Sequence, residues 1–384
     1  MDFLTKQIPT YLGNKRKLLP EIAACITDIQ KILNKSTITT GDGFSGTGVV
    51  SRLLKLYSTK LYTNDIAGYS KTLNQCFLST LTPKEIKKLK KIIHEANLYA
   101  HSDTSPPTNQ PPPPSNNPPA WIEKHWAPAD DSNISPTERA YFTHKNARLI
   151  DRYRYFITTI AKKWQPFLLA ALLVECSIHN NTSGQFSAFY KKDGKGEYGG
   201  KTGTDIKRIT NNIVLPELPI LSDKQCDIYI SQQDTNKWVE TLPEIDIMYY
   251  DPPYNKHPYS IYYFLLDIIN NWDTDMEIPD TYRGQPKNWY KSSYNSFVKA
   301  ETAFEDLIRK TPAKFILLSY NNGGIIPLPT LEKILKKYGT LTKRPVVHKT
   351  YNKLKGIANY KRQKKAQKIT EFIWILDRRA QGKV

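Results

Sequence analysis

The stretch TITTGDGFSGTGVVSRLLKLY, residues 37–57, joins a short β-branched run to a glycine-rich turn and then to an amphipathic helical pattern. The next stretch, KLYTNDI at residues 60–66, has the composition of a second strand and ends in an acid. A strand, a turn, a helix and a second strand in this order form the first half of a doubly wound α/β unit. Residues 37–66 therefore predict an α/β fold with a mostly parallel sheet.

Strand-and-turn alternation resumes only near residue 226, in CDIYISQQD, and continues through IDIMYYDPPYN, AKFILLSYNNGG and ITEFIWILD. The intervening residues lack this alternation. We therefore predict one α/β domain, residues 1–82 and 223–384, interrupted by an insertion, residues 83–222.

The insertion has a mainly helical pattern. It begins with the Lys-rich helical stretch PKEIKKLKKIIHEAN, and two further helical patterns cover residues 136–164 and 166–181. The proline-rich residues 103–119 cannot build a packed core, so we expect a flexible surface loop there.

The chain is strongly basic, with a formal net charge of +19 over 384 residues. This surplus predicts a polyanionic partner, for which nucleic acid is the best candidate. The alternative is that a Lys-rich composition reflects genome bias in a chain also rich in Asn, Ile and Tyr.

Cys25, Cys76, Cys176 and Cys226 lie far apart, without the paired spacing of a zinc ribbon or a disulfide framework. We therefore expect no metal and a reducing interior. The N-terminus lacks a signal-peptide pattern, and the apolar run FLLAALLVECSI is too short to cross a bilayer. We expect a cytoplasmic protein that is neither secreted nor bound to a membrane.

The glycine-rich turn GDGFSGTG predicts a cofactor site. Gly46 and Gly48 would let the backbone approach a ligand, although such turns occur in many α/β proteins. Asp65, at the end of the next strand, can accept both ribose hydroxyls of a nucleoside, or could instead be a helix N-cap. Asp42 at the head of the turn would repel a phosphate, but it suits the positive charges of S-adenosylmethionine.

The tetrapeptide DPPY, residues 251–254, follows an apolar strand and predicts chemistry at an exocyclic amine. The Asp251 carboxylate and the Pro252 carbonyl can each accept a hydrogen bond from one NH₂ group, and the proline pair stiffens the turn. The Tyr254 ring offers a flat face for the base that carries this amine. The alternative is a proline turn that caps a buried strand.

Together these motifs resemble the adenine-specific DNA methyltransferases of the Dam-like group. The resemblance rests on YLGNKRKLLPEI, GDGFSGTG with YTNDI, and DPPYN followed by YSIYYFLLDIINNWD. ERAYFTHKNARLID, HNNTSGQFSAFYK, FILLSYNNGGII and YNKLKG are similar to the restriction-modification members. Residues 103–119 and roughly residues 274–300 lie outside the resemblance.

The resemblance implies a Rossmann-like methyltransferase sheet that binds S-adenosylmethionine. Lys15 would lie near the carboxylate of its methionine end, Asp65 would hold the ribose, and Asp234 would touch the adenine ring unless it is an exposed loop acid. The implied cofactor residues are Tyr11, Gly13, Lys15, Asp42, Phe44, Gly46, Thr47, Gly48, Asp65, Ile66 and Asp234. The implied catalytic residues are Asp251, Pro252, Pro253 and Tyr254.

The implied reaction is direct methyl transfer to the N6 amine of an adenine flipped out of double-stranded DNA, without a covalent enzyme intermediate. Target recognition is expected in the insertion, which would act as the target-recognition domain. The basic segment 343–368 holds ten Lys or Arg and no acid, and predicts phosphate contacts unless it is simply solvated. The candidate DNA-binding residues are Asn180, Asn181, Thr182, Gln185, Lys191, Asn255, Lys353, Lys355, Lys361 and Arg362.

The resemblance also predicts the modification enzyme of a restriction-modification system, with a cognate endonuclease that shares its site without stable binding. One alternative is a ribosomal RNA guanine-amine methyltransferase, which can also carry DPPY but resembles a bare catalytic domain. A cytosine-amine enzyme would more often have serine in place of Asp251. A catalytically idle DNA-binding module would not need intact cofactor and catalytic motifs.

Overall fold

The computed structural model describes residues 2–102, 120–200, 203–287, 290–346 and 370–379. The predicted proline-rich loop, residues 103–119, lies outside these ranges. In the described residues, no helix has both the length and the apolar composition needed to cross a lipid bilayer.

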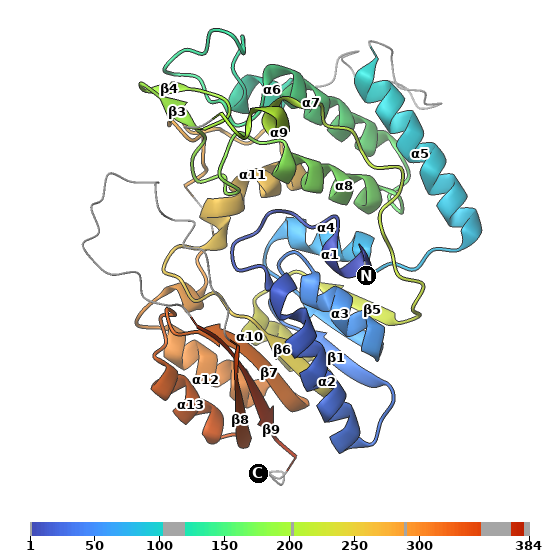
Figure 1. Ribbon diagram of the computed structural model, residues 1–384, viewed down its shortest axis with the longest axis vertical. Coiled ribbons are helices and arrows are strands. Elements are labelled where there is room, and N and C mark those ends of the chain that lie inside the picture. The colour runs from blue at the N-terminus through green and yellow to red at the C-terminus, as the bar shows by residue number, and fades with distance from the viewer. Residues whose placement is uncertain (1, 103–119, 201–202, 288–289, 347–369, 380–384) are drawn as a thin grey trace.

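A seven-stranded, mostly parallel sheet forms the centre of the fold (Figure 1), which confirms the predicted α/β class. All strands of this sheet but one run in the same direction, and the remaining strand is antiparallel to both of its neighbours. In spatial order the sheet contains β5 (Asp227–Ser231), β2 (Ser58–Asn64), β1 (Ile38–Asp42), β6 (Ile245–Tyr250), β7 (Ala313–Asn321), β9 (Glu371–Asp377) and β8 (Thr340–Val346).

Strand β9 is the antiparallel member, and it lies between β7 and β8. Because of this direction, the first residue of β9 pairs with the last residue of β7: Glu371 is opposite Asn321. The beginning of β9 therefore lies at the edge where the parallel strands end.

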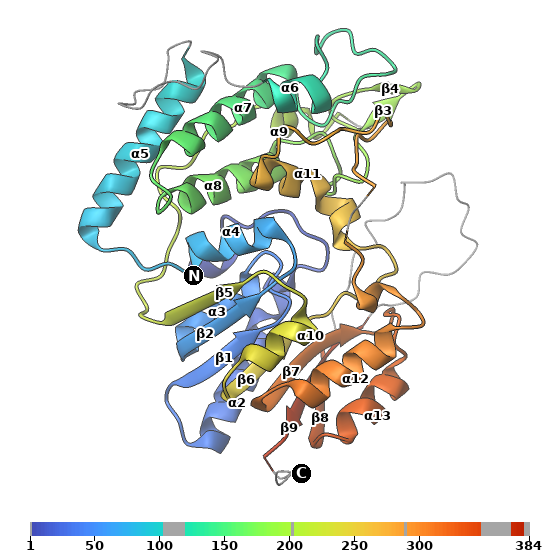
Figure 2. The ribbon, with the colours of Figure 1, turned by 180° about the vertical axis from the view of Figure 1, so that it is seen from behind.

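Helices cover both faces of the sheet (Figure 2). Alternate residues of β6 point to opposite faces, so Ile247 and Tyr249 join one apolar cluster while Met248 and Tyr250 join the other. This burial on both sides is typical of a parallel strand in a doubly wound fold. The first cluster includes α2 (Leu19–Leu33) and α3 (Val49–Tyr57), and the second includes α10 (Thr235–Trp238), α12 (Ala300–Lys310) and α13 (Leu328–Lys336).

A helical layer lies beyond one edge of the sheet, at the top of Figure 1. Described residues of the predicted insertion, 83–222, add no strand to the central sheet. They form α5 (Pro83–His101), α6 (Trp121–Trp126), α7 (His144–Thr159), α8 (Gln165–Ile178), α9 (Ile206–Thr210) and a hairpin of β3 (Lys191–Lys192) and β4 (Lys195–Gly196).

The apolar core of this layer continues past the predicted domain boundaries. Helices α4 (Gly68–Phe77) and α11 (Tyr259–Asn271) come from the α/β part of the sequence, yet their buried residues belong to the same cluster as those of α5–α8. The two parts of the chain are thus joined by packed helices rather than by exposed linkers.

Two predicted elements have different bounds in the structure. Helix α7 begins at His144, not near residue 136, because Thr143 is its N-cap and accepts a hydrogen bond from the backbone N of Asn146. The preceding residues instead bond to α6, since the backbone N atoms of Tyr141 and Phe142 donate to the carbonyl oxygen of Trp126. The predicted basic loop from residue 343 begins inside β8.

Candidate active site

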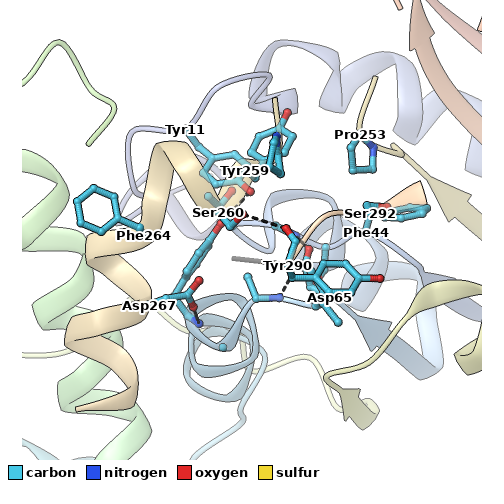
Figure 3. A pocket seen from close by; sticks show the side chains of 18 of the residues that line it. Tyr11, Phe44, Asp65, Pro253, Tyr259, Ser260, Phe264, Asp267, Tyr290 and Ser292 are labelled. Atoms are coloured by element: carbon cyan, nitrogen blue, oxygen red, sulfur yellow. Dashed lines mark hydrogen bonds between the residues drawn. The ribbon is translucent and has the colours of Figure 1, made fainter. Parts of the chain in front are cut away.

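Three neighbouring strands end at the same edge of the sheet, and a predicted motif follows each one. The glycine turn, residues 43–48, follows β1, Asp65 follows β2, and the tetrapeptide 251–254 follows β6. Because the carboxyl ends of parallel strands meet at one edge, the three motifs converge. They border a cavity of about 450 Å³ (Figure 3).

Backbone geometry at the turn requires glycine. Gly46 and Gly48 have φ of +51° and +75°, and a Cβ atom at Gly48 would lie 2.6 Å from Asn74 Oδ1. Asp65 Oδ2 accepts a hydrogen bond from the backbone N of Gly46 at 2.8 Å, and its Oδ1 accepts one from Ala67 at 3.0 Å. The Asp65 carboxylate therefore holds the turn and also lines the cavity.

Asp42 has a different position from the one expected. It is fully buried behind the turn, where its Oδ2 accepts a hydrogen bond from Ser51 Oγ at 2.6 Å. Burial raises the pKa of Asp42 to about 7. The structure therefore corrects its prediction as a wall of the cofactor site: Asp42 anchors α3 to the turn.

Most of the other predicted cofactor residues reach the cavity. Asp234 is one of them: its Oδ1 caps α10 by accepting from the backbone N atoms of Asn236 and Lys237, and its Oδ2 accepts from Tyr290 Oη at 3.0 Å. Gly48 instead forms the N-cap of α3. The predicted cofactor residues that line the cavity are Tyr11, Gly13, Lys15, Phe44, Gly46, Thr47, Asp65, Ile66 and Asp234.

Lys15 lies beside the tetrapeptide 251–254. Its side chain is only 5% exposed, and its Nζ is 3.1 Å from Asp251 Oδ1 and donates to Tyr254 Oη at 3.1 Å. In this structure the Lys15 ammonium is therefore paired with Asp251, whereas the resemblance implied a position near the carboxylate of the cofactor's methionine end.

Glu371 completes this cluster, and no sequence motif pointed to it. Its Oε1 lies 3.5 Å from Lys15 Nζ, and its Oε2 finds no hydrogen-bond partner among the described residues. One ammonium group is thus shared between two largely buried carboxylates. We refer to Lys15, Asp251 and Glu371 as the charge cluster.

The charge cluster shifts the pKa values of Asp251 and Lys15. Burial raises the pKa of Asp251 to about 7; the Lys15 ammonium opposes this shift and Glu371 adds to it. Burial acts to lower the pKa of Lys15, but the charges of Asp251, Tyr254 and Glu371 hold it well above its usual value. Lys15 is therefore charged at neutral pH, and Asp251 titrates near neutrality.

Tyr254 is largely buried, at 8% exposure, and packs edge-on against Tyr320 with ring centroids 5.4 Å apart. Lys15 Nζ lies 5.3 Å from the centroid of its ring. Pro253 lines the cavity, whereas Pro252 and Tyr254 are buried and do not line it. The backbone carbonyl of Asn255, the next residue, accepts a hydrogen bond from Asn295 Nδ2 at 2.6 Å.

Two tyrosines of α11 hold Tyr11 of the N-terminal motif, and an acid of the same helix lines the cavity; the sequence motifs did not single out these three residues. Tyr259 and Tyr263 stack with Tyr11 at centroid distances of 5.2 and 4.4 Å, and Asp267 follows one turn later in the cavity wall. Burial raises the pKa of Asp267 to about 7. Their spacing of four residues is only a partial signal, because α11 is kinked at Tyr263, whose φ of −127° and ψ of 20° are not helical. Figure 3 shows Tyr11, Tyr259 and Asp267 around the cavity.

The Asn-rich loop, residues 179–185, does not present its polar side chains as predicted. Asn180 Nδ2 donates to the carbonyl oxygens of Cys176 and Ser177, and Asn181 Nδ2 donates to those of Ala140 and Glu197. These side chains satisfy backbone groups that no strand or helix pairs. The structure therefore corrects the prediction that they contact DNA: Asn180, Asn181, Thr182 and Gln185 are all buried.

Lys191 remains exposed on the β3–β4 hairpin, with its Nζ 3.8 Å from the centroid of the Tyr282 ring. The four basic residues predicted to contact DNA near the C-terminus lie outside the described residues: Lys353, Lys355, Lys361 and Arg362. In the described part of the chain, no cluster of three or more His, Cys, Asp or Glu residues is arranged to hold a metal ion.

Comparison with known proteins agrees with this geometry. Type II methyltransferase M.NlaIII from Neisseria lactamica is 26% identical over 96% of this chain and 99% of its own length. The modification methylase LlaI from Lactococcus lactis (29% identical) covers 85% of this chain, and M.FokI from Planomicrobium okeanokoites (26% identical) covers 96%, but this chain spans only about half of each. The family model of D12 class N6 adenine-specific DNA methyltransferases matches residues 11–319, and the chain belongs to that family.

Proposed function

We propose that this chain methylates the N6 amine of an adenine that is turned out of duplex DNA into the cavity, with Asp251 and the Pro252 carbonyl as the acceptors for that amine. The observation that carries this proposal is the position of Asp251, at the end of β6 in the same cavity as the glycine turn and Asp65. Inside the base stack, the amine could not approach a methyl donor held at this edge.

The cavity residues fit S-adenosylmethionine, the methyl donor of this family. The cavity's carboxylates, Asp65, Asp234 and Asp267, suit a ligand with positive charges and ribose hydroxyls. Its aromatic walls, Tyr11 and Phe44, suit an adenine ring and a sulfonium centre. When bound, this cofactor supplies an electrophilic methyl group. We propose that Asp65 holds the ribose and that Asp234 lies near the adenine.

Asp251 acts as an acceptor in this proposal, and its ionised form is the stronger acceptor. An ionised carboxylate and a carbonyl that both accept from one NH₂ group favour a geometry in which the nitrogen lone pair leaves the plane of the base. The amine then becomes nucleophilic without a covalent intermediate. A pKa of about 7 for Asp251 means that this ionised form is reached near neutral pH.

Lys15 has a specific part in this proposal. Its ammonium contacts Asp251 and Tyr254, which are the groups that the incoming amine and base would meet. We propose that the adenine displaces Lys15 from Asp251 and that Glu371, already 3.5 Å away, keeps the ammonium paired. A buried charge left without a partner would make this exchange costly.

The printed names of the relatives, Type II methyltransferases and modification methylases, support a role in restriction-modification. We propose that a cognate endonuclease recognises the same site without stable binding to this chain, and that both act in the cytoplasm. Lys191 and the side chain of Asn255 remain candidates for contacts with DNA.

The direct test is methyl transfer from labelled cofactor to DNA, RNA and protein in parallel. We expect label only in DNA, at N6 of adenine within one short sequence. Label in RNA or in another base would contradict the proposal. Asp251→Asn is the matched control, because it keeps the size of the side chain and removes its charge.

A further inference from the structure

Residues 290–299 form one side of the cavity. Tyr290, Ser292, Tyr294 and Asn295 line it, and Tyr294 packs edge-on against Phe44 with ring centroids 5.3 Å apart. This segment lies in the part of the chain that the motif resemblance does not cover, so its function must come from the structure.

Two hydrogen bonds connect the segment to both halves of the site. Tyr290 Oη donates to Asp234 on the cofactor side, and Asn295 Nδ2 donates to the carbonyl oxygen of Asn255 at 2.6 Å. Asn255 directly follows the catalytic tetrapeptide. The residues just beyond Asn295 are therefore held next to the cavity wall.

Phe297 and Val298, which we call the apolar tip, follow at this point. They are 70% and 87% exposed, the highest values of any large hydrophobic side chain in the described residues. Their backbone is held on both sides, since the backbone N of Ala300 donates to the carbonyl oxygen of Ser296 at 2.9 Å as α12 begins. Two adjacent apolar side chains are thus presented to solvent from an ordered backbone, which favours a contact surface over a chance exposure.

The charged residues beside the apolar tip in the sequence are mostly basic, with one acid, Glu301, at the start of α12. Lys291 and Lys299 flank it in the sequence, Lys256 follows the hydrogen-bonded Asn255, and all three are exposed. The matching partner has an apolar face bordered by negative charge. Stacked bases between two phosphate backbones have this chemistry.

We propose that the apolar tip inserts into the base stack beside the target adenine and helps to keep that adenine extruded. This inference rests on the proposed function, because it assumes that the base enters the cavity next to the tip. An extruded base leaves a gap in the stack, and apolar side chains are used elsewhere as wedges between base steps. The flanking lysines would hold the tip against the backbone.

The test uses two double variants. The tip variant carries Phe297→Ala and Val298→Ala, and the control variant carries Ile32→Ala and Leu98→Ala, at two exposed apolar residues on α2 and α5. The substrate is a short duplex around an adenine that the parent enzyme methylates. A second duplex carries a mismatched base opposite that adenine, which lowers the cost of extrusion. Catalytic efficiency and the fluorescence of 2-aminopurine at the target position are measured on both.

We expect the tip variant to lose about 5- to 150-fold in catalytic efficiency on the matched duplex, the range of one lost base contact. The loss should shrink to less than about threefold on the mismatched duplex, and the fluorescence rise on the matched duplex should be smaller than with the parent. The control variant should behave as the parent does.

Three results would overturn the inference while the proposed function stands. The tip variant could match the parent on the matched duplex, or it could lose equal efficiency on both duplexes. It could also change a dimer into a monomer in sedimentation, which would assign the tip to a second copy of this chain. A parent enzyme that methylates no DNA would instead contradict the proposed function itself.

Discussion

The sheet edge and the Asn-rich loop both carry polar side chains, but those at the edge line a cavity and those in the loop pair with the backbone. At the edge, Asp65 and Asp251 reach into a cavity that could hold a cofactor and a base. In the loop, Asn180 and Asn181 are buried, and their side-chain amides donate hydrogen bonds to backbone carbonyl oxygens. A polar residue is therefore a good candidate for function only where the fold leaves its neighbourhood open.

Topology explains the difference. The carboxyl ends of parallel strands leave a crevice that helices do not fill, so a side chain there faces a potential ligand. The Asn-rich loop, residues 179–185, connects α8 to the β3–β4 hairpin inside the helical layer, where its backbone groups have few regular partners. Buried polar backbone must be paired, and the asparagine amides supply that pairing.

The largest effect is expected at Asp251. Asp251→Ala should lower turnover by roughly 10²- to 10⁴-fold, because a positioned acceptor for the reacting amine is lost. Cofactor affinity, measured by titration calorimetry, should change by less than about tenfold, since the carboxylate addresses the substrate. An Asp251→Ala protein that no longer binds cofactor would contradict the proposal that Asp251 contacts the substrate amine and Asp65 the cofactor.

Asp65→Ala should show the converse pattern. Each charge-assisted hydrogen bond to the ribose contributes roughly 1.5 to 3 kcal/mol, so cofactor affinity should fall by more than about tenfold. The loss also removes the acceptor for the backbone N of Gly46, and circular dichroism checks that the variant is folded. Equal affinities of parent and variant in calorimetry would argue against this residue as the ribose holder.

Asn181 tests the other side of the comparison. Asn181→Ala leaves two carbonyl oxygens without donors and should lower the free energy of unfolding by about 1 to 3 kcal/mol. The choice of target sequence should not change. Lys191→Ala, on the exposed hairpin, is the matched control: it should leave stability intact and reduce the salt dependence of DNA binding by about one phosphate contact. A changed target sequence in Asn181→Ala would restore this residue as a base reader.

The smallest effect concerns pH. The ionised form of Asp251 is the stronger acceptor, so the rate should rise as pH increases through about 7. Glu371 raises the pKa of Asp251, and Glu371→Gln should therefore move this rise to lower pH; Lys15 lowers the pKa, and Lys15→Gln should move it to higher pH. Rate profiles of the two variants that shift in the same direction would contradict the charge cluster as the origin of this pKa.

Much of the fold and of the cofactor site followed from local patterns. The β-branched runs that end in a glycine turn, Asp65 and Asp251 indicated the sheet, and the structure brings these motifs to one cavity. The convergence of these motifs was predictable because strand direction and residue order together fix which side chains meet. The family comparison confirms the adenine-specific DNA methyltransferase class and not the ribosomal RNA alternative.

Other features depend on contacts that no local pattern encodes. Glu371 is only the first residue of an apolar strand in the sequence, and its place beside Lys15 depends on the antiparallel direction of β9. Asn180 and Asn181 look like recognition residues because nothing in HNNTSGQ shows which carbonyl oxygens lie nearby. The helix wrongly predicted before His144 shows the same limit, because the backbone there donates its hydrogen bonds to the carbonyl oxygen of Trp126, which is distant in the sequence.

The position of β9 has a consequence for biosynthesis. Because β9 (Glu371–Asp377) lies between β7 and β8, the ribosome must release the chain through β9 before β8 can join the sheet. Until then, the edge of β7 is open to pairing with another nascent chain. Glu371 arrives with the same strand, so a chain interrupted before that residue carries every recognisable motif and still lacks the second counter-ion of Lys15. The sheet and the charge cluster would then be completed by one late event in synthesis.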